Sequence, residues 1–120
     1  MPSILINVTH GPEAPTRAAL GFLVGSTALT EGHDVTLFLA GDGVQLIRDD
    51  VLDSVTGVGT GSLRASYDAV VSGGGRIFLS AMSSKARGIA ASDLQGKPVE
   101  LAPPTRLVQL TLEHDRVLTY

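Results

Sequence analysis

The first forty residues alternate between apolar runs typical of strands and one long helical segment. Ile4–Val8 is a short, largely β-branched run, and Asp34–Ala40 is a second apolar run. Between them, Pro15–Glu31 has helical character: it opens with a proline suited to the first turn and is closed by Gly32. Apolar runs of this kind are typical of strands that a parallel sheet buries on both faces. The pattern therefore predicts a β-α-β unit of an α/β fold.

The rest of the chain continues the alternation with shorter elements. We expect a helical piece at Val44–Ile47 and an irregular, mobile connection over residues 48–61, with a short helix near Val51–Ser54. Ser62 is expected to cap a helix that runs to Gly73. The remaining expected elements are a strand at Ile77–Leu79, a helix at Ser84–Ala90, a strand at Pro98–Leu101, a helix from Pro103-Pro104-Thr105 to Glu113 and a strand at Arg116–Tyr120.

The alternation of Val108, Leu110 and Leu112 is equally compatible with a strand in place of that last helix. Together these elements predict one domain over residues 1–120. We expect a three-layer α/β/α architecture with a mainly parallel five-stranded sheet, similar to flavodoxin-like and Rossmann-like folds.

Composition excludes several classes of function. The chain has no cysteine, which removes thiolate catalysis and cysteine-ligated zinc or iron–sulfur clusters. The net charge is −3 and there is no run of lysine or arginine, so we expect no nucleic-acid partner. No run of about 18 apolar residues predicts a membrane helix. The amino-terminal residues lack the pattern of a secretion signal, so we expect a cytoplasmic protein.

A shortage of charge suggests that the protein associates with itself. Charged residues make up 18% of the chain, against about 25% in an average globular protein. The segment Pro15–Glu31 is apolar on nearly all sides, and Gly21 and Gly25 provide a flat strip for close backbone approach. A helix that only covers a sheet needs one apolar stripe. We therefore expect this helix to contact both the sheet and another subunit.

Three loops that follow expected strands are predicted to meet at the carboxyl edge of the sheet, where ligands of α/β proteins bind. They contain His10 and Gly11, then Gly43, and then the segment from Ser80 to Ser84. Ser83 and Ser84 precede a helix whose free N–H groups attract anions, although Ser83 as a simple cap is the alternative. The residues predicted to bind a ligand are His10, Gly11, Arg17, Gly43, Ser80, Ser83, Ser84 and Arg87.

The order of motifs along the chain resembles that of the DsrE/DsrF-like family. Three segments carry the resemblance: HGPEAPTRAALGFLVGSTALTEGHDVTLFLAGDGVQL within residues 6–46, GGGRIFLSAMSSKARGI (Gly73–Ile89), and the ending that closes with DRVLTY. The resemblance implies the fold expected above and a homotrimer or homohexamer.

The sulfur-carrying members that this chain resembles use a cysteine in the loop after the third strand as a persulfide carrier. Ser80 and Ser83 stand at the matching positions here, followed by Arg87 and Gly88 as the resemblance leads one to expect. A serine hydroxyl forms no persulfide and needs a strong base to ionise near neutral pH. Sulfur relay is therefore not predicted for this chain.

Other motifs offer weaker candidates for chemistry. His33 is expected to pack in a turn, and His114 is expected to be solvated, with no metal-ligand spacing. The acidic residues Asp49, Asp50 and Asp53 are expected to form a solvated loop edge. The glycines at positions 57, 59 and 61 and the Gly-Asp-Gly at 41–43 match neither a phosphate loop nor a dinucleotide-binding pattern, so no cofactor is predicted.

The sequence favours a non-catalytic protein that binds a small anionic or polar ligand and assembles with itself. Two alternatives remain open. One is an enzyme that uses Ser80 or His10, with Asp42 orienting the histidine, although the Gly-x-Ser-x-Gly elbow of serine hydrolases is missing. The other is an accessory subunit that docks on a cysteine-bearing relative.

Overall fold

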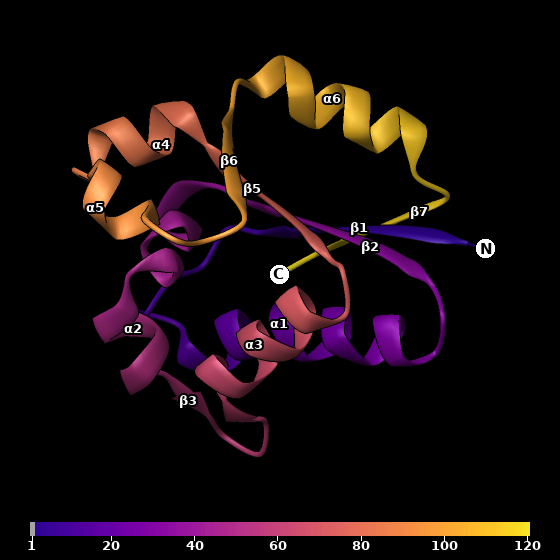
Figure 1. The fold of residues 1–120 in the computed structure, drawn as a ribbon, viewed down its shortest axis with the longest axis horizontal. Helices are drawn as coiled ribbons and strands as arrows, with labels where there is room; N and C mark the ends of the chain where they lie inside the picture. Colours follow the sequence, from indigo (N-terminus) through magenta and orange to yellow (C-terminus); the bar gives the residue numbers. More distant parts are fainter. Residues whose placement is uncertain (1) are drawn as a thin grey trace.

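The computed structural model describes residues 2–120 and shows a five-stranded parallel sheet covered by helices (Figure 1). The strands are β1 (Ser3–Val8), β2 (Asp34–Leu39), β3 (Thr56–Gly57), β4 (Gly61–Ser62), β5 (Arg76–Ser80), β6 (Val99–Ala102) and β7 (Arg116–Thr119). The helices are α1 (Pro15–Thr30), α2 (Asp49–Ser54), α3 (Leu63–Ser72), α4 (Ala81–Ala86), α5 (Ala91–Leu94) and α6 (Pro104–Glu113), with a 3₁₀ helix, η1 (Gly41–Ile47).

The main sheet has the order β6-β5-β2-β1-β7, and every neighbouring pair is parallel. The predicted α/β architecture is therefore confirmed. The chain steps outward from β1 through β2 and β5 to β6, and then α6 carries it back across the sheet to β7 on the other side of β1. The direction of winding thus reverses between β1 and β7, which is the topological switch point of an open sheet.

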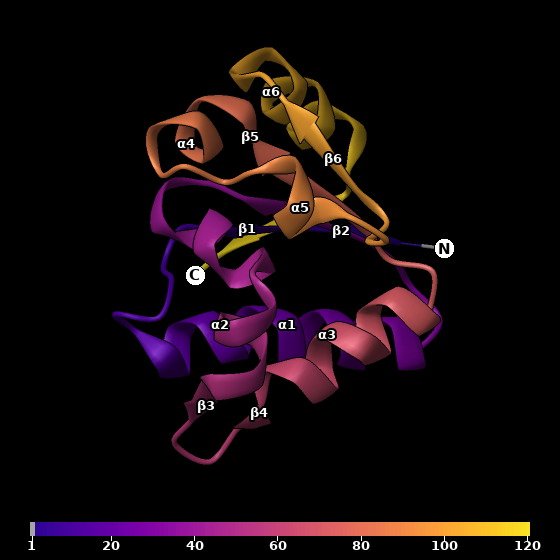
Figure 2. The same ribbon diagram turned by 60° about the vertical axis from the view of Figure 1, so that its left-hand side comes forward.

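Alternate residues of the central strands pack on opposite layers (Figure 2). The larger core lies between the sheet and helices α1 and α3, and the smaller one lies under α6. Residues Leu37 and Leu39 of β2 face the larger core, while Phe38 stacks with Phe78 under α6. Each such buried side chain contributes roughly 1.5–3 kcal/mol through removal of apolar surface from water.

Helix α1 owes its all-round apolar character to partners within the chain. A Cβ at Gly21 would lie 2.7 Å from Val8 Cγ2, and one at Gly25 would lie 3.5 Å from Ile6 Cδ1, so both glycines face the sheet. On another side, the Phe22 ring approaches the Tyr67 ring of α3, with centroids 6.2 Å apart. The helix therefore needs no second subunit to cover these residues.

Several boundaries differ from the sequence prediction. The expected helix at Ser84–Ala90 is wrong, because α4 begins at Ala81 and ends at Ala86. The connection over residues 48–61 holds, besides the expected short helix, an antiparallel hairpin of β3 and β4. Ser62 caps α3 as predicted, since its Oγ accepts the Ala65 N–H at 3.2 Å.

The amino terminus is joined to β7 by hydrogen bonds. The Ser3 backbone N–H donates to the Asp115 carboxylate at 2.8 Å, and the Ser3 hydroxyl also donates to it. These bonds lower the pKa of the Asp115 carboxyl because they favour its ionised form. They hold the last strand in register beside β1.

Among residues 2–120, no helix is both long enough and apolar enough to cross a membrane.

Two glycine substitutions should differ sharply in their effect on stability. A Cβ at Gly43 would lie 2.2 Å from the Val8 carbonyl oxygen, so Gly43→Ala forces backbone to move and should lower the free energy of unfolding by about 2 kcal/mol or more. Gly25→Ala meets only ordinary contacts in a helix, where alanine is favoured by about 1 kcal/mol, and should be neutral or stabilising. Urea unfolding measures both. Equal losses in the two variants would contradict the packing described here.

Candidate functional site

The loops that follow β1, β2 and β5 come together at the carboxyl edge of the sheet, as expected for parallel strands. Two glycines allow the first two of these loops to touch through their backbones. A Cβ at Gly11 would lie 2.3 Å from the Asp42 carbonyl oxygen, and Gly43 lies equally close to Val8. Gly11 and Gly43 thus bring the loops together, and both are buried.

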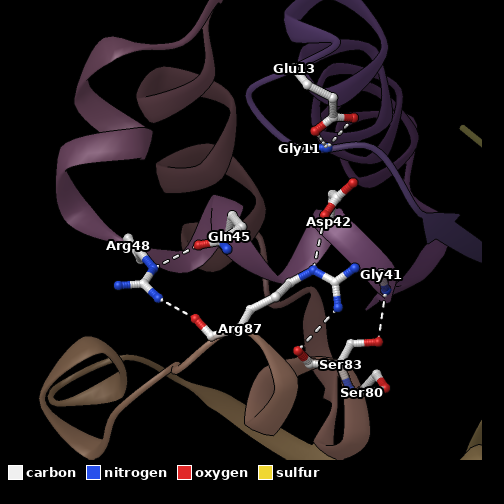
Figure 3. A network of polar contacts seen from close by, with 9 residues as sticks. All are labelled: Gly11, Glu13, Gly41, Asp42, Gln45, Arg48, Ser80, Ser83 and Arg87. Atoms are coloured by element: carbon white, nitrogen blue, oxygen red, sulfur yellow. Dashed lines mark hydrogen bonds and ion pairs between the residues drawn. The ribbon is translucent and has the colours of Figure 1, made fainter.

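Side chains of η1 and α4 join the second and third loops (Figure 3). The Gly41 N–H donates to Ser83 Oγ at 2.9 Å. Arg87 Nε donates to Asp42 Oδ1 at 2.9 Å, and Arg87 Nη1 donates to the Ser83 carbonyl oxygen at 3.3 Å. The Arg87 guanidinium is therefore paired with the Asp42 carboxylate, and these bonds link the end of α4 to η1.

Ser80, not Ser83 or Ser84, caps helix α4. Ser80 Oγ accepts the Ser83 N–H at 3.2 Å, one turn into the helix. Ser80 and Ser83 thus each accept one backbone N–H, and neither hydroxyl hydrogen has an acceptor among residues 2–120. Ser84 differs, because it is 3% exposed and its Oγ has no partner there. Two oriented hydroxyls at this edge can therefore donate to an acceptor.

A second group of polar side chains follows β1. Arg17 Nη1 lies 3.3 Å from His10 Nε2, and Thr9 Oγ1 lies 3.4 Å from His10 Nδ1. Because a guanidinium only donates, His10 Nε2 is the acceptor in the contact with Arg17. Thr9 in turn donates to the Tyr120 carbonyl oxygen at 3.1 Å. This chain of bonds lies at the switch point between β1 and β7.

The charges at this edge balance. Arg17 forms no ion pair within residues 2–120, whereas the Glu13 carboxylate accepts the Gly11 N–H at 2.8 Å. Together with the Asp42–Arg87 pair, this gives two cations and two carboxylates. These four side chains therefore give the edge no net charge, although the edge still has free hydrogen-bond donors.

A Ser80–His10–Asp42 catalytic arrangement is not formed. The Asp42 carboxylate bonds Arg87, and both ring nitrogens of His10 bond Arg17 and Thr9, so Asp42 does not orient the histidine and the histidine does not reach Ser80. Within the described residues, no three His, Asp or Glu side chains gather closely enough to hold a metal ion.

The predicted solvation of His114 is wrong. His114 Nδ1 lies 2.6 Å from the Leu110 carbonyl oxygen, and Nε2 lies 3.0 Å from Thr36 Oγ1. The ring is thereby held between α6 and β2, at the amino edge of the sheet. His33 lies in the turn between α1 and β2, where its Nδ1 is buried.

The acidic segment also differs from its prediction. Its carboxylates are exposed as expected, but they belong to helix α2, and two of them, Asp49 and Asp53, form ion pairs. Arg64 bonds Asp53 at 2.8 Å and Asp49 at 3.1 Å, and Lys97 lies 3.3 Å from Asp49. The hydrogen bond from Arg64, followed by that from Lys97, lowers the pKa of Asp49. These pairs link α2 to α3 and to the segment before β6.

Sequence reasoning missed Asp42 as the ion partner of Arg87, and it missed Glu13 as a partner of Gly11. The Glu13 contact had a local signal, because its carboxylate reaches back only two residues. The Asp42–Arg87 pair spans 45 residues of sequence, and only the adjacency of β2 and β5 brings it together.

Two serine substitutions distinguish a bonded hydroxyl from an unbonded one. Ser83→Ala leaves the Gly41 N–H without its acceptor and should lower the free energy of unfolding by about 1–2 kcal/mol. Ser84→Ala removes a buried hydroxyl that has no partner, so it should leave stability unchanged or raise it. Urea unfolding compares the two variants. A larger loss for Ser84→Ala than for Ser83→Ala would contradict the hydrogen bonding in Figure 3.

Solved structures with the same fold come from bacteria and an archaeon. The ychN protein of E. coli has 19% identity and a TM-score of 0.80, with 100% of both chains covered. A protein of unknown function from Methanobacterium thermoautotrophicum has 13% identity and a TM-score of 0.73, also with 100% of both chains covered. One from Bacteroides thetaiotaomicron has 13% identity and a TM-score of 0.72, covering 98% of this chain and 94% of its own. These likenesses show the fold.

Among curated proteins, none matches the sequence. The model of the DsrE/DsrF-like family matches residues 3–120, which is nearly the whole chain and includes every loop of the carboxyl edge. The protein belongs to the DsrE/DsrF-like family, as a member without cysteine.

Proposed function

We propose that this protein binds a small polar or anionic ligand at the carboxyl edge of its sheet, without catalysis and without persulfide chemistry. The observation that carries the proposal is the pair of oriented hydroxyls on Ser80 and Ser83. Backbone N–H groups occupy one lone pair of each oxygen, so each hydroxyl hydrogen is available to an acceptor on a ligand.

Arg17 and His10 extend the site toward the switch point. Arg17 is exposed and has no carboxylate partner within residues 2–120, so it can turn from His10 to an anionic group of a ligand. Arg87 supports the site by holding η1 against α4, and its remaining N–H groups face the same edge (Figure 3). Gly11 and Gly43 are buried against backbone and Ser84 is 3% exposed, so they shape the site from behind, whereas Ser80 keeps 9% of its surface exposed at the edge.

The surroundings of the two hydroxyls support binding rather than catalysis as the proposed role. An attacking serine requires a base within hydrogen-bond reach, and the histidine of this edge is engaged by Arg17 and Thr9 instead. A thiolate, which would act without such a base, is absent from the chain. Binding is therefore the chemistry that these residues support best.

We further propose that the protein forms a homotrimer or homohexamer through α6 and β7. Helix α6 lies on the face of the sheet opposite α1 and α3 (Figure 2) and exposes Val108 and Leu112. Strand β7 is an edge strand with all four residues exposed, Val117 and Leu118 among them. A second copy of the chain would cover these aliphatic side chains, in keeping with the low content of charged residues.

The ligand proposal is tested by NMR titration of the ¹⁵N-labelled protein with inorganic phosphate, sulfate, acetate and glycerol at near-physiological salt. At least one probe should shift the amides of Gly41, Ser80 and Ser83. The double variant Ser80→Ala, Ser83→Ala should weaken that binding about tenfold, since two hydrogen bonds are lost. Ser84→Ala is the matched control and should bind as the wild type does. No shift with any probe, or equal binding by the double variant, would count against the site.

The assembly proposal is tested by sedimentation of matched surface variants. Leu112 is 82% exposed on α6, and Val58 is 89% exposed at the tip of the β3–β4 hairpin. Leu112→Lys should convert a trimer or hexamer into smaller species because it places a charge in the contact. Val58→Lys, an equally exposed change elsewhere, should leave assembly intact. A monomeric wild type would refute the proposal, and a hetero-oligomer with a cysteine-bearing relative would replace it with an accessory role.

A further inference from the structure

A groove of about 670 Å³ lies at the amino edge of the sheet, opposite the carboxyl-edge site. It runs across the starting residues of β1, β2 and β5 and is bounded by the carboxyl ends of α1, α3 and α6. Its polar lining includes Ser3, Asp34, Thr36, Arg76, Glu113 and His114. The volume is that of an ordinary small-molecule site. Nothing in the carboxyl-edge proposal uses these residues.

A chain of hydrogen bonds holds one cation in the wall of this groove. Arg76 Nη2 donates to Thr36 Oγ1 at 3.2 Å, and Thr36 Oγ1 lies 3.0 Å from His114 Nε2. The Leu110 carbonyl oxygen can only accept, so His114 Nδ1 carries the proton there. The other ring nitrogen, Nε2, bonds the hydroxyl of Thr36, which is 1% exposed. The buried hydroxyl is thereby satisfied on both sides and orients the Arg76 guanidinium.

Arg76 and Asp34 carry opposite charges that do not neutralise each other. Arg76 stands opposite Thr36 in the register of β5 and β2, and Asp34 precedes Thr36 by two residues, so all three lie on the same face of the sheet. Neither Arg76 nor Asp34 forms an ion pair within residues 2–120. Glu113, by contrast, lies 3.9 Å from Arg106. The groove thus presents one cation and one carboxylate without ion partners, on neighbouring strands of the sheet.

The ends of the helices add to this asymmetry. Three helices end at the groove, so their terminal carbonyl groups give this edge a negative potential that favours a cation. A simple anion would be attracted by Arg76 but repelled by Asp34 and by the helix ends. A simple cation would be attracted by Asp34 and by the helix ends but repelled by Arg76. Only a molecule with both charges a few ångströms apart matches all of these groups.

We propose that the amino-edge groove binds a small zwitterion of the amino-acid type. Its carboxylate bonds the free N–H groups of Arg76, and its ammonium group lies against Asp34 and the helix carboxyl ends. A guanidinium bound to a carboxylate is among the stronger charge-assisted hydrogen bonds, which makes Arg76 the anchor of the site. The proposal is independent of the carboxyl-edge site, because the two sites share no residue.

The test is an NMR titration of the full-length ¹⁵N-labelled protein with three probes. L-alanine carries both charges, propionate carries only the carboxylate, and ethylamine carries only the ammonium group. We expect L-alanine to shift the amides of Gly32, Gly73 and Gly74, which line the groove, and to bind about tenfold more tightly than either partial probe. Absence of these shifts at about 50 mM L-alanine, a concentration well above ordinary substrate levels, would overturn the proposal.

Three variants assign the contacts. Arg76→Gln should abolish the shifts produced by L-alanine. Asp34→Asn changes an exposed side chain with no side-chain hydrogen bond, so the fold should survive, and the affinity for L-alanine should fall to that for propionate. Arg116→Gln is the matched control, because Arg116 is an exposed arginine that forms no ion pair within residues 2–120 and does not line the groove. Unchanged binding in Asp34→Asn, or loss of binding in Arg116→Gln, would contradict the assignment.

Discussion

The backbone contact between the end of β1 and the start of η1 is the constraint on which the carboxyl edge depends. Gly43 lies against the Val8 carbonyl, and Gly11 lies against the Asp42 carbonyl, with no room for a side chain at either place. This contact places Gly41 where its N–H reaches Ser83 and places Asp42 where its carboxylate reaches Arg87. The third loop is thus positioned by the first two.

The same geometry explains how the loop after β5 is held in place without a cysteine. The resemblance of this chain to sulfur-carrying proteins places a cysteine at the loop that here holds Ser80 and Ser83. In this chain the two serines have structural tasks: one caps α4 and the other accepts a hydrogen bond from η1. Their hydroxyls stabilise the loop and still present donors, but they lack the base that nucleophilic attack requires. The proposed role, recognition of a ligand without group transfer, rests on this arrangement of the two serines.

The strands and the parallel sheet could be predicted from the sequence because burial on both faces leaves a local mark. A run such as Val35–Leu39 is buried at every position, and a short β-branched and aromatic run bounded by turn residues is typical of such strands. The start of α4 could not be placed in the same way. Ser80, Ser83 and Ser84 are all suitable caps, and the structure shows that Ser80 has that role while Ser83 accepts a tertiary hydrogen bond from Gly41.

Long-range contacts account for the other errors. His114 bonds Thr36 across 78 residues of sequence, so its neighbours Glu113 and Asp115 gave a false indication of solvation. The sheet and α3 cover part of the apolar surface of α1 within one chain, and the expected contact of this helix with a second subunit stays a prediction. The amino-edge groove was missed because its charges come from residues that begin or end separate elements.

Native mass spectrometry of the gently purified protein tests the central claim most directly, because it reports the assembly and any bound small molecule in one spectrum. The account predicts a trimer or hexamer in which each subunit carries a small polar molecule, and it predicts that this extra mass disappears when Ser80 and Ser83 are both replaced by alanine. A bare monomer would contradict the account. An extra mass that persists both in the double serine variant and in the amino-edge variants would also contradict it.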